Sequence, residues 1–296
     1  MIKNFFNSNN IEYIEETSLK KYNTYRLDTK CKYIVFPKNV DELIKIIKEL
    51  KAKKIKYYII GNGSNIIFSM DYYEGVIIKL DRLNKVTYNN NIVTAEAGYP
   101  LIKLAMETID KALSGFEFAA GIPGSVGAST AMNAGAYNSD MSSIIKEVSV
   151  LTEDYKIKIF TNKELMFSYR DSILKKNPNL IVLSTTFELQ PGIKEEMKEK
   201  VEERKIKRLN SQPLNMPSAG SVFRNPENMS AGMLIENINL KGYCINDAQI
   251  STKHANFIIN KGNATGKDII ELINKIKKEI KNNYNIELKL EQIIIE

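Results

Sequence analysis

The sequence is poor in the residues that build metal centres and covalent cross-links. It has two cysteines and one histidine in 296 residues. Cys31 and Cys244 lie far apart and lack the spacing of metal ligands, which argues against a disulfide framework and favours two buried free thiols. His254 alone cannot complete a zinc site with them. We therefore expect no bound metal.

Long apolar runs are also missing. No stretch approaches the roughly 20 apolar residues that a helix needs to cross a bilayer. The amino-terminal segment MIKNFFNSNNIEYIEE lacks the apolar core of a signal peptide. We expect a cytoplasmic protein without membrane insertion.

The balance of charge does not indicate nucleic acid as a partner. The net charge is +7, from 42 basic and 35 acidic residues. The lysines are mixed with glutamates, as in GIKEEMKEKVEERKIKR (residues 192–208), and such a run is typical of a solvated helix face. An excess of basic groups also suits an anionic nucleotide substrate and cofactor.

Length and periodicity predict an α+β protein with two or three compact units. A helical period with a cap at Asn39 or Asp41 predicts a helix that runs through Leu50. Further helices are expected at 101–113, 125–137, 193–210, 231–238 and from Thr265 or Asp268 to about 280. Strands are expected at 57–60, 76–80, 92–98, 146–152, 156–160, 180–189, 255–260 and 286–295.

The segment 190–192, Gln-Pro-Gly, interrupts these patterns before the charged helix. Proline and glycine are the strongest local breakers of regular structure. We place the domain boundary there, with a first domain at 1–195, itself divided near residue 70, and a second at 196–296.

The stretch around which the chain is organised is GIPGSVGASTAMNAGAYNSD (residues 121–140), with four glycines and four alanines. So few bulky side chains let main-chain N–H groups approach a ligand closely, and glycine permits the positive φ angles that turn successive amides toward one anion. The pattern predicts a phosphate or pyrophosphate site. A run of small residues also lets a helix pack tightly on a sheet, so this structural alternative stays open.

Two further turns contain small residues. IGNGSNII (residues 60–67) follows an apolar run and resembles a strand that ends in a glycine-rich turn, but it lacks the third glycine of a dinucleotide-binding fingerprint. PSAGSVFRNP (residues 217–226) places Ser221 in a turn just ahead of an arginine and an asparagine.

These segments, with NTYRL (23–27), FSYRDS (167–172) and KHANFIIN (253–260), resemble the UDP-N-acetylenolpyruvoylglucosamine reductase family in the same order from about residue 23 to residue 295. The family consists of flavoenzymes that complete UDP-N-acetylmuramate for peptidoglycan. The short interval between Arg170 and Ser221 resembles the variety of this reductase that lacks an extra tyrosine-bearing substrate loop.

The resemblance implies an FAD-binding first domain of the vanillyl-alcohol-oxidase (PCMH) type and a smaller substrate-binding second domain. A flavin diphosphate needs several converging N–H donors and little side-chain bulk. The implied cofactor-binding residues are Gly61, Asn62, Gly63, Ser64, Asn65, Gly121, Ile122, Pro123, Gly124, Ser125, Gly127, Ala128, Asn133 and Ala136. Asn62 and Ala128 stand where the family more often has glycine, and asparagine tolerates a left-handed backbone.

The resemblance also implies how the cofactor is held and reduced. Flavin enzymes of this fold class often attach FAD through a histidine, but the only histidine here lies in the second domain. We therefore expect noncovalent FAD, with NADPH as the hydride donor. His254 itself is expected to be structural.

Reduction of an enolpyruvyl ether requires a hydride on one vinyl carbon, a proton on the other, and stabilisation of the charge that develops on the carboxylate side. By resemblance, Ser221 would give the proton to C2 after flavin N5 delivers hydride to C3. Arg170, with its planar fork, and Glu291 would flank the substrate carboxylate and the developing enol. Apart from the resemblance, a serine in this context is typical of a turn or a helix N-cap.

The residues around the proposed carboxylate match the family only in part. The family usually has valine after this glutamate, where this chain has Gln292, and strand alternation does not exclude Glu287. The place of Glu291 before the apolar run 293–295 favours it. The implied substrate-binding residues are Tyr169, Arg208, Arg224 and Asn225.

Two other functions stay open. The first is an FAD oxidase or dehydrogenase that acts on a sugar or hydroxy acid, and PSAGSVFRNP and the single histidine argue against it. The second is a catalytically silent protein that binds a sugar nucleotide. The presence of Ser221, Arg170 and Glu291 together argues against this loss of activity.

Overall fold

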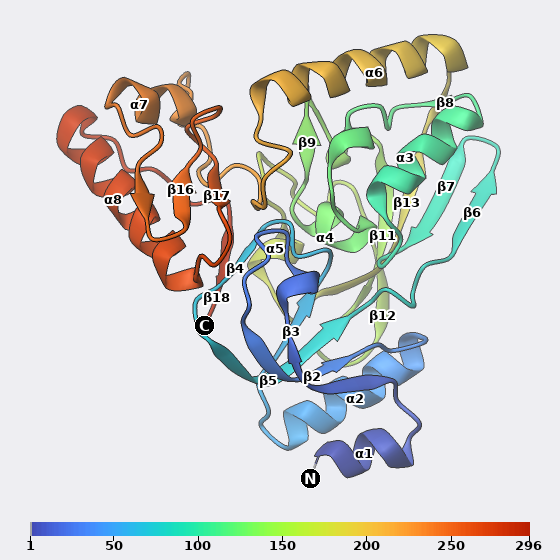
Figure 1. The fold of residues 1–296 in the computed structure, drawn as a ribbon. Helices are drawn as coiled ribbons and strands as arrows, with labels where there is room; N and C mark the ends of the chain where they lie inside the picture. Colours follow the sequence, from blue (N-terminus) through green and yellow to red (C-terminus); the bar gives the residue numbers. More distant parts are fainter. Residues whose placement is uncertain (1) are drawn as a thin grey trace. The chain divides into compact units, whose positions relative to one another are not determined.

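The protein is described by a computed structural model that covers residues 2–296. The chain divides into two compact units, and each is assembled from three segments (Figure 1). Unit 1 comprises Met1–Ile14, Tyr33–Gly61 and Gly75–Lys205, and unit 2 comprises Glu15–Lys32, Asn62–Glu74 and Ile206–Glu296. Each unit has its own buried apolar cluster. The expected division at residue 195 into a cofactor and a substrate domain stays a prediction.

Unit 1 contains most of the regular structure. Its helices are α1 (Ile2–Ser8), α2 (Val40–Ala52), α3 (Leu101–Asp110), α4 (Val126–Ala131) and α5 (Ile173–Lys176), with 3-10 turns η2 (Ala119–Gly121) and η3 (Met141–Ser143). Its strands are β3 (Tyr57–Ile60), β6 (Val86–Asn89), β7 (Ile92–Glu96), β8 (Leu113–Ser114), β9 (Gly135–Ala136), β10 (Ser139–Asp140), β11 (Ile145–Leu151), β12 (Ile157–Thr161), β13 (Ile181–Glu188) and β14 (Gln190–Pro191).

Unit 2 is smaller. It contains η1 (Lys20–Tyr22), β4 (Ile66–Phe68), α7 (Ala231–Asn237), β15 (Cys244–Ile245), β16 (Ala248–Ile250), β17 (Ile258–Asn260), α8 (Gly266–Tyr284) and β18 (Ile293–Ile295). Four elements continue along the chain from one unit into the other: β1 (Tyr13–Ser18), β2 (Lys30–Val35), β5 (Tyr72–Lys79) and α6 (Lys194–Ser211).

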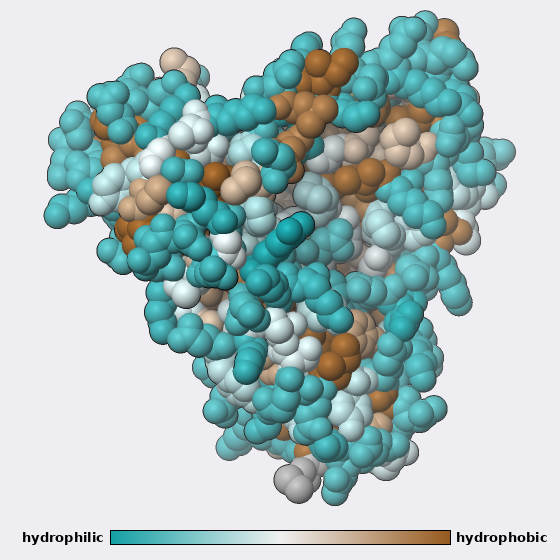
Figure 2. Space-filling view, viewed as in Figure 1, coloured by the Kyte–Doolittle hydropathy of each residue, from teal (hydrophilic) through white to brown (hydrophobic). Residues whose placement is uncertain are grey.

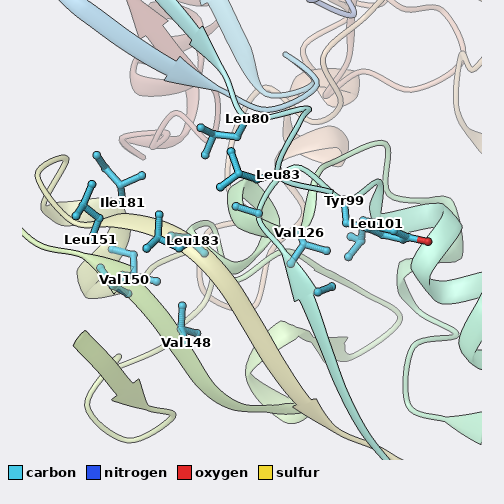
Figure 3. Packing of buried hydrophobic residues seen from close by; sticks show 14 of the residues in the cluster. Leu80, Leu83, Tyr99, Leu101, Val126, Val148, Val150, Leu151, Ile181 and Leu183 are labelled. Atoms are coloured by element: carbon cyan, nitrogen blue, oxygen red, sulfur yellow. The ribbon is translucent and has the colours of Figure 1, made fainter. Parts of the chain in front are cut away.

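The larger sheet of unit 1 has five antiparallel strands in the order β12-β11-β13-β7-β6. Apolar side chains of β11 and β13 gather on it in Figure 3, where Val150 lies beside Leu183 and Val126 lies near Tyr99 and Leu101. This packing fixes the start of α4, which carries the small-residue segment, against the unit 1 core.

The other large sheet has the order β1-β2-β5-β3, and β3 runs parallel to β5 with Ile60 opposite Lys79. Within unit 1, α2 begins after Asn39, whose side chain accepts a hydrogen bond from the Glu42 amide (2.9 Å). This confirms Asn39 rather than Asp41 as the N-cap. The buried face of α2 places Leu43 and its neighbours in the unit 1 core.

In unit 2, α8 packs against β15 and β16 (Figure 1). Its first turn is closed by a capping box, in which Thr265 accepts from the Asp268 amide and Asp268 accepts from the Thr265 amide. Thr265 is therefore the cap of the two that the sequence offers. The strand β18 pairs in parallel with β4, with Ile293 opposite Ile66.

Several elements are shorter than the sequence predicts. The last strand covers Ile293–Ile295 instead of residues 286–295, because residues 286–292 pair only through an isolated bridge between Phe223 and Leu290. The helix expected at 101–113 ends at Asp110, and Leu113 begins β8, which pairs with β14 in the expected breaker segment. Only Val126–Ala131 is helical in the stretch 125–137, since Asn133 has a positive φ.

On the face seen in Figure 2, hydrophilic residues predominate and apolar residues form separate patches. Within residues 2–296, the structure contains no helix with the length and apolarity needed to span a membrane.

Candidate active site

In unit 1, Gly61 follows strand β3 and lies against the start of α4. A Cβ atom at Gly61 would stand 2.6 Å from Ser125 Oγ and 2.9 Å from Ala128 Cβ. Real side chains do not approach so closely, so this position requires glycine. Two segments predicted to bind the cofactor diphosphate are thus brought together, although they lie about 60 residues apart in sequence.

The segment 121–128 is held in place by hydrogen bonds from its main chain to the segment after β7. The amides of Val126 and Gly127 donate to the carbonyls of Tyr99 and Ala97 (2.9 and 2.8 Å). These two N–H groups are therefore used by the protein, which supports the structural alternative that small residues let α4 pack closely. Gly127 has this packing role, because a Cβ there would lie 2.7 Å from Ala97 Cβ.

The remaining groups of this segment are small and differ in exposure. Gly124 lies close to Ser129, since a Cβ at residue 124 would stand 2.5 Å from Ser129 Oγ. Ile122 and Gly121 are half-buried, and Pro123 is exposed. Ser125 is 4% exposed, and no hydrogen bond of its hydroxyl group is found in unit 1 as the structure describes it. This hydroxyl can serve a ligand.

A buried lysine lies beneath the Gly61 turn. Lys79 is 4% exposed, and its ammonium group donates to the Gly61 carbonyl (2.7 Å) and pairs with Asp81 (3.2 Å). A charge-assisted hydrogen bond of this kind fixes the carbonyl and leaves positive charge near the turn. The glycine contacts, the Ser125 hydroxyl and this ammonium group fit the diphosphate of a flavin dinucleotide.

Arg170 lies in a tight turn in which Ser168 and Asp171 exchange main-chain hydrogen bonds (3.0 and 3.1 Å). Its φ is +56°, a left-handed conformation that costs free energy for an arginine and is concentrated at functional sites. Its guanidinium donates to the Gly135 carbonyl (2.5 Å) and lies over the ring of Tyr169, which is 52% exposed. The predicted Tyr169 and Arg170 therefore form one cation–π pair.

Asn133 supports this turn. Its side-chain nitrogen donates to Ser168 O (2.9 Å) and Asp140 Oδ2 (3.1 Å), and its oxygen accepts from the Ser142 amide (2.9 Å). Asn133 is 1% exposed, so its side chain serves the protein. The neighbouring Ala136 belongs to β9, which pairs with β10.

In unit 2, the rest of the GNGSN turn lies next to the main chain of Glu291. Asn65 Nδ2 donates to the main-chain carbonyl of Glu291 (3.2 Å), and the Ile293 amide donates to Asn65 O (2.9 Å). Gly63 has φ +66°, and a Cβ there would collide with the Tyr22 carbonyl. Asn62 is exposed and does not have a positive φ, so the residue with left-handed backbone in this turn is Gly63. Ser64 is half-buried.

Val222, the residue after Ser221, lies opposite Glu291 within the same unit. The Glu291 amide donates to Val222 O (2.9 Å), and the Val222 amide donates to Asn256 O (2.9 Å). Ser221 is half-buried, and no hydrogen bond of its hydroxyl group is found among the described residues of unit 2. The turn is thus held by its main chain while the hydroxyl can meet a ligand.

The other predicted residues of unit 2 have structural contacts of their own. Arg208 Nε donates to Gln212 Oε1 (3.1 Å) near the end of α6, and Asn225 Oδ1 accepts from the Ala231 amide (3.1 Å) at the start of α7. The Arg224 amide donates to Lys289 O (2.9 Å). His254 Nδ1 accepts from the Asn256 amide (3.2 Å), as expected of a structural histidine. Among residues 2–296 the structure has no cluster of three or more acidic, histidine or cysteine side chains that could hold a metal.

Three supporting side chains lie outside the set of residues predicted from the sequence. Lys79 is the charged residue in the apolar run VIIKL, and a lysine at a buried strand position is a signal that could have been used. Asn256 lies in KHANFIIN, and its amide side chain bonds both main-chain groups of Phe223 (3.0 and 2.8 Å). Gln292 gives a weaker signal, as a polar residue ahead of an apolar run.

Comparisons with known proteins agree with these features. Residues 212–295 match the model of the UDP-N-acetylenolpyruvoylglucosamine reductase C-terminal domain, and residues 31–160 match that of an FAD binding domain. The reductase of Clostridium perfringens strain SM101 is 38% identical over 295 residues, which is 100% of this chain and 96% of that protein. The reductase of Lactobacillus acidophilus is 42% identical over 96% of this chain and 95% of that protein.

Solved structures give the same result. The crystal structure of UDP-N-acetylenolpyruvylglucosamine reductase from Thermus caldophilus superposes with a TM-score of 0.81 at 31% identity, over 97% of this chain and 99% of that one. A glucooligosaccharide oxidase from Acremonium strictum has a TM-score of 0.51 at 14% identity, over 98% of this chain and 59% of that one. The second likeness concerns the fold alone.

These matches confirm the predicted fold class, with its FAD-binding first part and smaller C-terminal domain. They also confirm FAD as the cofactor and a flavin-dependent oxidoreductase as the class of enzyme. Because relatives above 30% identity match along nearly the whole of both chains, the protein belongs to the UDP-N-acetylenolpyruvoylglucosamine reductase family.

Proposed function

We propose that the protein reduces UDP-N-acetylglucosamine enolpyruvate to UDP-N-acetylmuramate with NADPH, in the cytoplasm, as a step of peptidoglycan precursor synthesis. The hydrogen bond from the Glu291 amide to Val222 O (2.9 Å) carries the proposal. It sets a carboxylate residue opposite the turn that contains Ser221. A proton donor and an acidic group on paired segments suit the addition of a proton to an enolpyruvyl ether.

When bound, FAD would supply the two-electron chemistry by accepting hydride from NADPH and passing it from N5 to C3 of the enolpyruvyl group. Its diphosphate would be held by residues 61–65 and 121–128, with the Ser125 hydroxyl as a side-chain donor. The expected absence of a covalent link is supported by His254, whose Nδ1 is engaged with the Asn256 amide inside unit 2.

Ser221 would give a proton to C2. An unperturbed hydroxyl group is a weak acid, so the transfer needs a fixed geometry and an anionic centre that takes up the proton as it forms. Arg170 and Glu291 would act on the carboxylate side, where the guanidinium stabilises developing negative charge. The left-handed backbone at Arg170 fits such a role, because strain of this kind persists where the surroundings hold the residue in place.

The nucleotide-sugar part of the substrate would be bound by Tyr169, Arg208, Arg224 and Asn225. An arginine offers a planar fork for phosphate oxygens, and an exposed tyrosine ring offers a flat apolar surface with a polar end. Tyr169 is the exposed ring of this set.

Anaerobic turnover tests this function. The purified protein should consume one NADPH for each UDP-N-acetylmuramate formed, as measured by the absorbance of NADPH and by mass spectrometry of the product. Oxygen should be a slow acceptor. Rapid formation of peroxide with a simple sugar, without a response to the enolpyruvyl nucleotide, would identify an oxidase instead, and binding of the nucleotide without turnover would identify a silent binding protein.

A further inference from the structure

Gln292 follows Glu291 and is buried in unit 2. The residue is 3% exposed, and its side-chain nitrogen donates to the carbonyls of Ala219 (3.0 Å) and Gly220 (3.3 Å). Its side-chain oxygen accepts from the hydroxyl group of Tyr25 (3.0 Å). One amide therefore joins the segment of the proposed carboxylate to the two residues that precede Ser221.

The orientation of this amide follows from its partners. Main-chain carbonyls can only accept hydrogen bonds, so the nitrogen of Gln292 faces Ala219 and Gly220, and the oxygen faces Tyr25. Tyr25 is fully buried, and burial raises the pKa of its hydroxyl group, which stays protonated and donates. The amide of Gln292 is thus fixed from both ends.

Of the two residues before Ser221, Ala219 packs in the buried apolar cluster of unit 2, whereas Gly220 has no side chain to pack. Gly220 has φ +74°, and a Cβ atom built on it would meet nothing within 4 Å. Side-chain packing therefore does not restrain Gly220, and the bond from Gln292 does. After Ser221 the chain is held differently, because the Val222 amide donates to Asn256 O and Asn256 bonds both main-chain groups of Phe223.

We propose that Gln292 is a positioning residue that fixes the hydroxyl group of Ser221 for proton transfer. This inference rests on the proposed function of Ser221 as the proton donor. Without the amide, Gly220 can rotate and Ser221 moves relative to the substrate, while the binding groups elsewhere are unchanged. Misplacement of a reacting group by about 1 Å can cost on the order of 100-fold in rate.

The variant Gln292→Leu tests the inference, because leucine fills a similar volume and forms no hydrogen bond. We expect reduction of the flavin by NADPH to keep its rate, and reoxidation by the enolpyruvyl substrate to slow by about 10-fold to 100-fold. Both steps are followed by stopped-flow absorbance of the flavin band. The matched control is Gln249→Leu, which removes another glutamine bond to a carbonyl of unit 2, at Gly242 (3.1 Å), and should leave both rates unchanged.

A double-variant cycle separates positioning from a general loss of structure. In a Ser221→Ala background there is no donor left to position, so Gln292→Leu should slow reoxidation no further. An equal further loss in that background would overturn the inference, because Gln292 would then act on something other than Ser221. If Gln292→Leu folds poorly, Tyr25→Phe with Gln292→Leu removes the hydroxyl group left without its partner and should restore the melting temperature but not the rate.

The outcomes also distinguish the inference from the proposed function. If Ser221→Ala abolishes reoxidation and Gln292→Leu leaves it unchanged, the positioning role is wrong while the proton donor stands. If Ser221→Ala leaves reoxidation unchanged, Ser221 is not the donor and both proposals are wrong.

Discussion

The side chain of Asn133 donates a hydrogen bond to the main-chain carbonyl of Ser168 (2.9 Å), across 35 positions of sequence. Ser168 opens the tight turn that contains Arg170. Since the same side chain also bonds Asp140 and Ser142, its hydrogen-bonding groups are engaged within unit 1. The main-chain amide of residue 133 is engaged too, with Thr130 O (3.1 Å), so the role of this residue is to hold the arginine turn.

The variant Asn133→Ala should therefore weaken the use of the substrate more than the binding of the cofactor. We expect the free energy of unfolding to fall by about 1–3 kcal/mol, because buried partners lose their hydrogen bonds. The KM for the enolpyruvyl substrate should rise, while the FAD dissociation constant changes little. Asn162→Ala is the control, since it loses two bonds to carbonyls, at Ser142 and Ile145 (both 2.8 Å). Equal effects of both variants on KM would contradict the role of Asn133.

Substitution of Lys79 should have the opposite effect, because it should weaken the binding of FAD more than the binding of substrate. Lys79→Met removes a charged hydrogen bond to the Gly61 carbonyl and the positive charge beside that turn. Because the Gly61 turn loses this restraint and the positive charge beside it, the FAD dissociation constant should rise by roughly 10-fold or more. Titration of the apoprotein with FAD, followed by flavin fluorescence, measures the change. Lys158→Met in the exposed part of β12 should leave the affinity unaltered, and an unaltered affinity in Lys79→Met would refute the prediction.

Local features of the fold are predictable from the sequence where a short motif determines them. The caps at Asn39 and Thr265 depend on a hydrogen bond within four residues, and the sequence shows both partners. The final strand is predicted too long because its length depends on a distant partner. Ile293 pairs in parallel with Ile66, where the partner strand begins, so residues 286–292 have no part of β4 to join.

In the candidate site too, contacts between residues far apart in sequence could not be predicted. Gly61, Ser221 and Glu291 could be named from their motifs, but the contacts that hold them join residues far apart. Tyr25 and Gln292 bond each other across 267 positions, and no local pattern predicts such a pair. The amides of Val126 and Gly127 also look available in sequence, and only the fold shows that carbonyls of the segment after β7 accept from them.

The single histidine makes the pH dependence of stability simple to interpret. Burial lowers the pKa of His254, and the nearby charge of Lys241 acts in the same direction. The unfolded chain takes up a proton below the ordinary histidine pKa of about 6.5, while the folded protein does not until lower pH. Since the unfolded state then binds more protons, stability falls as pH falls through this window.

We therefore expect the melting temperature to decrease from about pH 7.5 to about pH 5.5. His254→Asn should reduce this decrease, because asparagine can still accept from the residue 256 amide in an Asx turn but does not titrate. The melting temperatures of both proteins, measured by calorimetry across this range, check the prediction. A decrease of the same size in both proteins would mean that another group titrates.

The cofactor should be removable. Because the sequence contains no histidine outside unit 2 and FAD is expected to be held by hydrogen bonds, heat or acid should release it completely. The absorbance of the polypeptide after gel filtration under denaturing conditions measures what remains. Yellow colour that stays with the polypeptide would show a covalent bond and contradict this expectation.

Ser221→Ala should separate the two halves of the reaction. The substitution removes one hydroxyl group from a turn that is held by main-chain bonds at Val222 and by the Gln292 amide at Gly220, so the fold should be kept. Reduction of the flavin by NADPH needs no proton from this residue and should keep nearly its normal rate. Loss of a positioned general acid typically costs on the order of 100-fold to 10,000-fold, so reoxidation by the enolpyruvyl substrate should collapse.

Stopped-flow spectra of the flavin band follow each half separately, and the substrate dissociation constant is measured alongside. The loss should fall on the rate of reoxidation with little change in that constant, because the hydroxyl group acts mainly in the transition state. Equal slowing of both halves would show that Ser221 is structural. An unchanged rate in both halves would mean that the proton reaches C2 from another group, and since Glu291 is the acidic residue paired with this turn, Glu291→Gln would then be the variant expected to abolish reoxidation.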